Sequence, residues 1–311
     1  MCFGHKCIVI FNILINKMTK KLIKITLLLL VFISFNSFSE DMSDSTNNKN
    51  FLWEVKSENS TVYLLGSIHI GKKEMYPLNP IIENSFNASD NLVVEVNINN
   101  ASSASNSVDM VYSGDSTVKN ELSDYRYEKL KEIAKYCNIP SIMINKFRLG
   151  YSLIFLQLKK LIELGYIPDY GVDMYFLNKA EGKRVLELET SDSQIELMNS
   201  LVYSVDTNTI DLELFKPGIE IMDSLMYAWQ NGNTKYLEEI LTSQDSIFSF
   251  GGNDMDYKLN DERNFKMIEK IEDYLKSKEK YFIIVGAAHL VGENGIINLL
   301  NRKNKYFIKQ L

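Results

Sequence analysis

The amino-acid sequence predicts an α/β fold, with a mixed central sheet of parallel crossovers and a helical excursion in the middle of the chain. Three observations support this prediction. Short apolar runs of strand length alternate with stretches of helical periodicity. Two of these runs, residues 62–65 and 281–285, each lead into a Gly-x-x-His quartet. Long helical patterns fill the middle of the chain, and we expect them to cover the sheet.

Local signals place the first elements in order. Residues 40–50 are polar and are expected to form a flexible lead-in. Residues 51–69 contain two β-rich runs around a Ser-Glu-Asn-Ser turn, which is typical of a hairpin. A short helix is expected near residues 81–88, followed by a buried strand in "NLVVEVNI" (91–98). Strand, helix, strand suggests a parallel crossover, and the Asn- and Ser-rich residues 97–120 suggest a loop.

The middle of the chain has helical spacing. Leu130, Ile133, Ala134 and Cys137 fall at i, i+3, i+4 and i+7, and the pattern continues up to Gly165. The remaining elements are expected in this order: a helix and turn in 171–183, the strand "RVLELE" (184–189), a helical stretch over 215–243, a flexible loop over 249–261, a helix near Glu262–Lys276 and a strand over 281–286.

Residues 1–39 have the features of a signal peptide with an upstream extension. From Met18 the chain has a lysine-rich start, an apolar stretch of about a dozen residues and a small-x-small end at Ser37-Phe38-Ser39. We expect Met18 to be the start codon, cleavage near Ser39, and a secreted or periplasmic protein. The alternative is a retained membrane anchor, although the apolar run is shorter than the ~20 residues that a span needs.

The composition of the expected mature chain excludes several classes of protein. Cleavage after Ser39 removes five lysines and no acidic residue, which leaves 29 basic (34 minus 5) against 40 acidic residues and a net charge of −11. Nucleic acid is therefore not an expected partner. Cys137 would be the only cysteine, so no internal disulfide can form. Residues 51–311 are long enough for one large α/β domain with a sizeable core.

The two histidines beyond the signal segment share one motif. His69 and His289 lie 220 positions apart (289 minus 69), and each closes a Gly-x-x-His quartet after a hydrophobic run. In open α/β sheets, sites form outside the carboxyl ends of strands. The glycine lets another backbone or a ligand come close, and imidazole is both a metal ligand and a general base. The pair predicts one site, whereas the alternative is a polar residue at each strand end.

Eight sequence fragments resemble, in order and approximate spacing, the TraB/GumN family, which also contains the TIKI-type metalloproteases. The resemblance covers about residues 51–311 and implies an erythromycin-esterase/ChaN-like fold with the Gly-x-x-His motifs in the active site. The fragments are Trp53, "YLLGSIHIG", "YPL", "VVEV", "GVD", "KRVLELET…Q", "ERN" and "VGAAHLVGENGI…LL".

Three glutamates are candidates for this site. Glu95 interrupts the apolar run "LVVEV", where an ionised carboxylate is costly without a partner. It either faces solvent or has a partner, and the resemblance assigns it to the site, where His69, Glu95 and His289 would form the metal ligands. Glu187 and Glu189 share one face of a strand. Glu189, nearer the carboxyl end, is the better candidate.

Arg263, Asp173 and Ser67 each have two interpretations. The resemblance places Arg263 at the site, where it would hold Glu95 or stabilise an oxyanion, whereas the sequence alone allows a surface arginine. Asp173 in "GVD" is explained as well by helix capping as by catalysis. Ser67 is not expected to be a nucleophile, because "LLGSIHIG" lacks the Gly-x-Ser-x-Gly elbow.

The resemblance implies a metal-dependent hydrolase, most directly a peptidase, with catalytic residues His69, Glu95, Glu189, Arg263 and His289. A metal-bound water would attack the carbonyl, a glutamate would take its proton, and the arginine would stabilise the oxyanion. The expected cofactor is a divalent metal (manganese, cobalt or zinc), and the partner is a peptide or small-molecule substrate, with a membrane tether if the signal stays uncleaved. The alternatives are a metal-independent esterase-like hydrolase, with either histidine as general base, and a non-catalytic protein that binds pheromone, haem or another ligand.

Overall fold

A computed structural model of the chain describes residues 49–97, 110–242 and 257–311. The predicted signal peptide, most of the predicted lead-in and most of the loop predicted over 249–261 lie outside these ranges. No helix in the described ranges is both long enough and apolar enough to cross a membrane.

The described residues form a mixed α/β fold. The strands are β1 (Leu52–Lys56), β2 (Thr61–Ser67), β3 (Asn91–Val94), β4 (Arg184–Glu187), β5 (Tyr281–Gly286) and β6 (Phe307–Gln310). The α-helices are α2 (Pro80–Asn87), α3 (Asp124–Tyr136), α4 (Ser141–Ile144), α5 (Leu149–Glu163), α6 (Val172–Asn178), α7 (Ser191–Tyr203), α8 (Leu212–Phe215), α9 (Pro217–Gln230), α10 (Thr234–Thr242), α12 (Glu262–Lys276) and α13 (Ile296–Arg302). Short helical turns occupy Lys73–Met75, Val118–Asn120, Pro168–Tyr170, Thr207–Thr209, Tyr257–Asp261 and Ala287–Leu290.

The six strands form one sheet in the order β4-β3-β5-β2-β1-β6. β2 and β3 both pair with β5 in parallel, and β4 extends the parallel part beside β3. β1 pairs antiparallel with β2 and with β6, so the predicted hairpin is confirmed. The predicted parallel crossover from β2 through α2 to β3 is also confirmed. β2 and β3 are not neighbours in the sheet, because β5, which comes from near the end of the sequence, lies between them.

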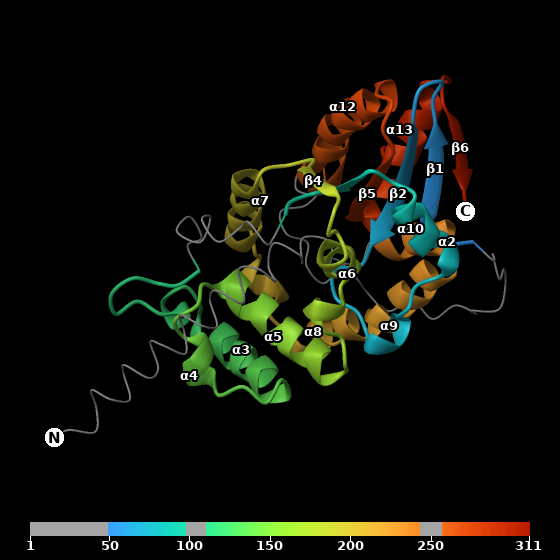
Figure 1. Ribbon diagram of the computed structural model, residues 1–311. Helices are drawn as coiled ribbons and strands as arrows, with labels where there is room; N and C mark the ends of the chain where they lie inside the picture. The colour runs from blue at the N-terminus through green and yellow to red at the C-terminus, as the bar shows by residue number, and fades with distance from the viewer. Residues whose placement is uncertain (1–48, 98–109, 243–256) are drawn as a thin grey trace.

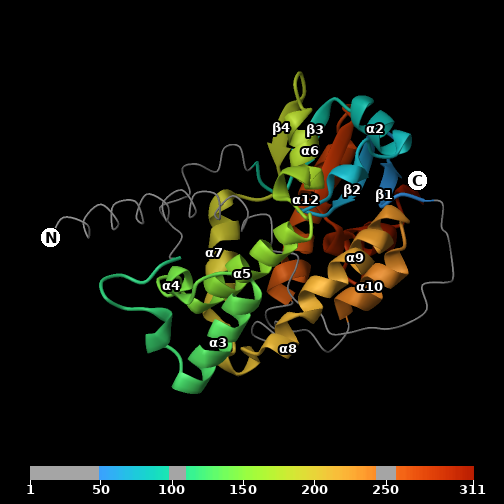
Figure 2. The ribbon, with the colours of Figure 1, turned by 90° about the horizontal axis from the view of Figure 1, so that it is seen from below.

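Helices cover both faces of the sheet. Phe86 of α2, Phe176 of α6 and Phe282 of β5 pack together with ring centroids 4.8 to 5.4 Å apart, which fixes α2 and α6 on one face. On the opposite face lie α12 and α13 (Figures 1 and 2). α12 has an amphipathic pattern, and its buried residues, from Arg263 to Leu275, face the interior of the protein. The strands that lead to the site described below are therefore covered by helices on both faces of the sheet.

The middle helices α3, α4, α5, α7 and α8 form a separate group. They cluster to one side of the sheet rather than over a face of it (Figures 1 and 2), which differs from the expectation that they cover the sheet. Their apolar faces pack on one another instead, and α5 alone buries residues from Leu149 to Leu161. Caps fix where α3 and α7 begin, because Ser123 accepts a hydrogen bond from the amide of Arg126 and Thr190 accepts one from Ser193.

Candidate functional site

The parallel strands bring the predicted residues to one edge of the sheet. Ser67, the last residue of β2, pairs in register with Gly286 of β5, and the two Gly-x-x-His histidines follow these strand ends. Glu95 comes directly after β3, and Glu189 comes shortly after β4, with its amide donating to the carbonyl of Glu95 at 2.9 Å. Because parallel strands end at the same edge, these side chains can meet.

His69 is held by a buried carboxylate from α6. Its Nδ1–H donates to Oδ2 of Asp173 at 2.6 Å, and Ser67 Oγ donates to the other oxygen at 3.1 Å. Burial lowers the pKa of the His69 imidazole, but the charge and hydrogen bond of Asp173 outweigh burial and raise the pKa above 6.5. Asp173 therefore leaves Nε2 of His69 available for chemistry.

Two glycines allow close approach of chain segments here. A Cβ on Gly66 would lie 2.4 Å from the ring of Phe51 and 3.1 Å from the backbone of Ala287, and one on Gly171 would lie 2.3 Å from the carbonyl oxygen of His69. The prediction that the glycine of the first quartet permits close approach is confirmed. Gly171 has the same effect at the start of α6, which carries Asp173.

An arginine and two glutamates form a buried cluster. The guanidinium of Arg263 donates from Nε to Glu189 at 2.8 Å and from Nη2 to Glu95 at 2.5 Å and to Glu189 at 2.7 Å. Its Nη1 donates to the carbonyl of Leu259 at 3.0 Å. Gln194 of α7 bridges the two carboxylates at 3.0 and 3.1 Å. Each nitrogen of the Arg263 guanidinium thus already donates a hydrogen bond.

Glu95 stays ionised in this buried position. Burial raises the pKa of its carboxyl group, but the charges of Arg263 and the two histidines, together with the Gly286 amide, outweigh burial and lower the pKa to about 2. The amide of Gly286 in the second quartet adds a hydrogen bond to Oε1 at 2.7 Å. The carboxylate pair in turn raises the pKa of the guanidinium above its ordinary value.

His289 is fully buried and is oriented by α12. Asn264 uses its amide nitrogen to donate to the carbonyl of Asn294 at 2.9 Å, so its Oδ1, 2.7 Å from Nδ1 of His289, acts as the acceptor. Nδ1 therefore carries the proton, and the lone pair is on Nε2. That atom lies 3.7 Å from Oε1 of Glu95 and has no hydrogen-bond partner among the residues described. Burial, followed by the charge of Arg263, lowers the pKa of His289 to about 4.

The structure brings Glu95, Glu189, Arg263 and His289 together, as the sequence predicts. His69 lies close enough for the charges of Glu95 and Arg263 to affect its pKa. Burial leaves His69, Glu95 and Arg263 only 5 to 7% exposed and His289 without exposed surface.

The remaining candidates lie as follows. Asp173 binds His69 instead of capping α6, whose N-cap is Gly171. Ser67 lies on the Asp173 side of the imidazole, so the geometry gives no support to a nucleophilic serine. Glu187 lies outside the cluster and accepts a hydrogen bond from the amide of Asn97 at 2.6 Å.

Sequence reasoning did not identify Asn264 or Gln194 as site residues. Both belong to fragments that carry the family resemblance, "ERN" and "KRVLELET…Q". Their roles depend on which side chains α7 and α12 bring beside them, and no local pattern encodes that.

A divalent metal does not fit the side chains as they are arranged. Across 49–97, 110–242 and 257–311, no group of three or more His, Cys, Asp or Glu side chains could hold a metal ion. Both oxygens of Glu95 already accept hydrogen bonds. In addition, the fixed positive charge of Arg263 opposes a second cation beside Glu95. His69 and His289 each have one ring nitrogen left, which is fewer donors than a catalytic metal site uses.

Comparisons with known proteins identify relatives along most of the chain. A family model described as "TraB/PrgY/gumN family" matches residues 51–306. The chain is 23% identical over 256 residues to "Uncharacterized protein YbaP" of Escherichia coli (strain K12), which covers 78% of this chain and 88% of the relative. It is also 23% identical over 252 residues to the protein of the same description from Shigella flexneri, with 76% and 87% covered. No solved structure gives a significant match.

Proposed function

Because the chain belongs to the TraB/PrgY/gumN family, we propose that it is a hydrolase that cleaves peptide bonds at the histidine–glutamate–arginine cluster. The observation that carries this proposal is the presence, at one strand edge, of two buried imidazoles whose pKa values are shifted in opposite directions. Asp173 raises the pKa of His69, whereas burial lowers that of His289. Two titratable groups whose environments separate their pKa values are typical of an acid–base site.

In this proposal His69 is the general base. With Nδ1 bound to Asp173, Nε2 takes a proton from a water molecule as the water oxygen attacks the substrate carbonyl. The same nitrogen then returns the proton to the leaving amine, and the carboxylate of Asp173 stabilises the imidazolium in between. Asp173 raises the pKa of His69 and so strengthens the imidazole as a base, whereas Glu95, with a pKa of about 2, is a weak base.

His289 and Arg263 have positioning roles. Nε2 of His289, which has no hydrogen-bond partner in the described part of the chain, is an acceptor that can orient the attacking water. Arg263 holds Glu95 and Glu189 in place, and its existing hydrogen bonds favour this role over stabilisation of an oxyanion. The negative charge of the cluster also stabilises an imidazolium at His69.

A metal-dependent form of the reaction is the second candidate. The observation in its favour is the buried Nε2 lone pair of His289, which is the state that a metal-ligating histidine needs. Manganese, cobalt or zinc would require Glu95 to leave Arg263. Elemental analysis, together with cleavage assays before and after chelation, separates this form from the metal-independent one.

The experiment is a peptide-cleavage screen on the purified chain with His69→Gln and His289→Gln variants, each checked for folding by circular dichroism. We expect both variants to lose about a hundredfold or more in rate, since a hundredfold is the low end of what general acid–base catalysis contributes. Glu269→Gln, on the exposed face of α12, is the control. Asp173→Asn should move the pH midpoint of the rate downward, which a merely structural role would not do. Undiminished cleavage in both histidine variants would refute the proposal.

Further parts of the proposal concern substrates, fold and location. Cleavage of esters in a substrate panel would indicate an esterase-like enzyme. Ligand binding without turnover would indicate a protein that binds pheromone, haem or another ligand. Such a protein should keep its affinity when His69→Ala and Glu95→Ala are combined. We also propose an erythromycin-esterase/ChaN-like fold, which superposition of an experimental structure tests. Export with cleavage near Ser39, or a membrane tether through an uncleaved signal, is tested by N-terminal sequencing of the mature protein.

A further inference from the structure

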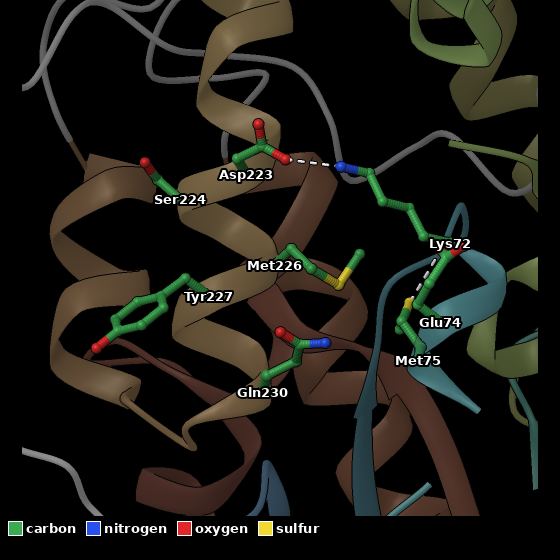
Figure 3. A pocket seen from close by; sticks show the side chains of 8 residues that line it. All are labelled: Lys72, Glu74, Met75, Asp223, Ser224, Met226, Tyr227 and Gln230. Carbon is green, nitrogen blue, oxygen red and sulfur yellow. Dashed lines mark hydrogen bonds and ion pairs between the residues drawn. The ribbon is translucent and has the colours of Figure 1, made fainter. Parts of the chain in front are cut away.

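A cavity of about 370 Å³ lies between the Lys72–Met75 segment and α9, apart from the histidine cluster. Its volume falls within the range of small-ligand sites, about 300–1,000 Å³. Figure 3 shows Met226 and Gln230 of α9 directed toward the Lys72–Met75 segment. The cavity therefore separates two chain segments that lie beside the first Gly-x-x-His quartet.

Both walls are anchored to that quartet. Lys72 follows His69 by three residues, and Gly71 between them forms a β-bridge with Ile167. On the other wall, the indole Nε1 of Trp229 in α9 donates to the carbonyl of Gly66 at 2.6 Å. A ligand in the cavity thus contacts segments whose positions are tied to His69.

The cavity combines an apolar lining with polar groups. Met75 and Met226 line it and are mostly buried, at 8% and 6% exposed. Methionine side chains adapt to ligands of different shape. Gln230 and Ser224 also line the cavity and make no side-chain hydrogen bond with another described residue. They can therefore pair with the peptide groups of a ligand.

The charges at the cavity do not cancel. The ammonium of Lys72 lies 2.9 Å from Asp223 and 4.2 Å from the ring centroid of Tyr166, and the hydroxyl of Tyr166 also donates to Asp223. Lys72 and Asp223 thus compensate each other. Glu74 has neither an ion pair nor a hydrogen bond to any side chain in the described part of the chain. The carboxylate of Glu74 is therefore a negative charge at the cavity that Lys72 does not neutralise.

We propose that this cavity binds a lysine or arginine side chain of an extended peptide, a proposal that rests on the peptidase function proposed above. The methylene stem of the side chain lies on Met75 and Met226, and its cationic end pairs with Glu74. Ser224 and Gln230 bind the peptide backbone. The cavity thereby selects basic peptides for the site at His69.

The test measures binding and cleavage separately. A fluorescently labelled peptide, acetyl-Ala-Ala-Lys-Ala-Ala-amide, and its norleucine analogue are titrated into the full chain and followed by anisotropy. The wild type is expected to bind the lysine peptide more tightly, by up to about fivefold, which is the upper end of what an exposed ion pair provides. Glu74→Gln should bring the ratio near one, Glu269→Gln should keep it, and Ser224→Trp should weaken both peptides by filling the cavity.

Each result decides one of the two proposals. Equal binding of the two peptides by the wild type, or an unchanged preference in Glu74→Gln, overturns the cavity proposal, whatever is cleaved. A lysine preference that Glu74→Gln abolishes supports it even if no peptide is hydrolysed, and in that case it is the proposed catalytic function that fails.

Discussion

Replacement of His289 by glutamine tests whether a neutral imidazole is buried beside Asn264. The pKa of His289 is about 4 in the folded protein, against an ordinary 6.5. Between these values the unfolded chain binds a proton that the folded chain does not. The free energy of unfolding therefore falls as the pH is lowered from 6.5 to 4, by about 3 kcal/mol at about 1.4 kcal/mol per pKa unit. Glutamine does not titrate, so the variant lacks this loss.

The measurement is urea-induced unfolding of both proteins at pH 7.5 and pH 4.5, followed by circular dichroism. At pH 7.5 the wild type should be the more stable, and at pH 4.5 its advantage should shrink by about 2 to 3 kcal/mol. The titration of Glu95, with a pKa of about 2, lies below this window and is common to both proteins. An advantage that stays constant or grows on acidification would refute a buried neutral His289.

His69→Gln is the matched control, with the opposite sign. The pKa of His69 is raised above 6.5, so its stabilising contribution is fully present below pH 6.5 and is lost as the pH rises through the folded-state pKa. The advantage of the wild type over His69→Gln should therefore be larger at pH 4.5 than at pH 7.5.

Three further variants test individual contacts of the site. Arg263→Leu leaves Glu95 and Glu189 buried without their cation and should lower the free energy of unfolding by about 3–5 kcal/mol; adding Glu95→Gln and Glu189→Gln should restore part of it, and a loss below about 1 kcal/mol would contradict the burial of this cluster. Asn264→Asp should raise the pKa of His289, seen by NMR titration of its ring protons, and an unchanged midpoint would argue against the hydrogen bond to Nδ1. Gly171→Ala puts a Cβ 2.3 Å from the carbonyl oxygen of His69 and should cost roughly 1–3 kcal/mol in urea unfolding; wild-type stability would contradict that close approach.

Local sequence signals were sufficient for most of the strands. The hairpin, β3, β5 and α12 lie where apolar runs, turn residues and helical spacing predict them. β6 was not predicted, because Phe307 and Lys309 are exposed while Ile308 and Gln310 are only half-buried. Such an edge strand has no clear apolar face and forms because β1 offers it hydrogen bonds. The position of the middle helices also depends on which surfaces meet, which local periodicity does not encode.

The sequence alone predicted those site residues that stand out by their position in an unusual local pattern. Two matching histidine quartets and a glutamate inside an apolar run are conspicuous, and they converge in the structure. Arg263 could be assigned only by resemblance, since nothing local shows that its side chain points inward. Asn264 and Gln194 act through partners on other elements, so their contribution is visible only once α7 and α12 are in place.

The central place of β5 in the sheet has a consequence for how the protein is made. β2 and β3 are synthesised early, yet they do not pair with each other, and both edges that they offer to β5 stay open until residues 281–286 emerge from the ribosome. Contacts between such distant segments slow folding, and exposed edges invite pairing with other chains. The nascent chain therefore depends on late insertion of one strand, and until then the open edges of β2 and β3 are exposed to pairing with other chains.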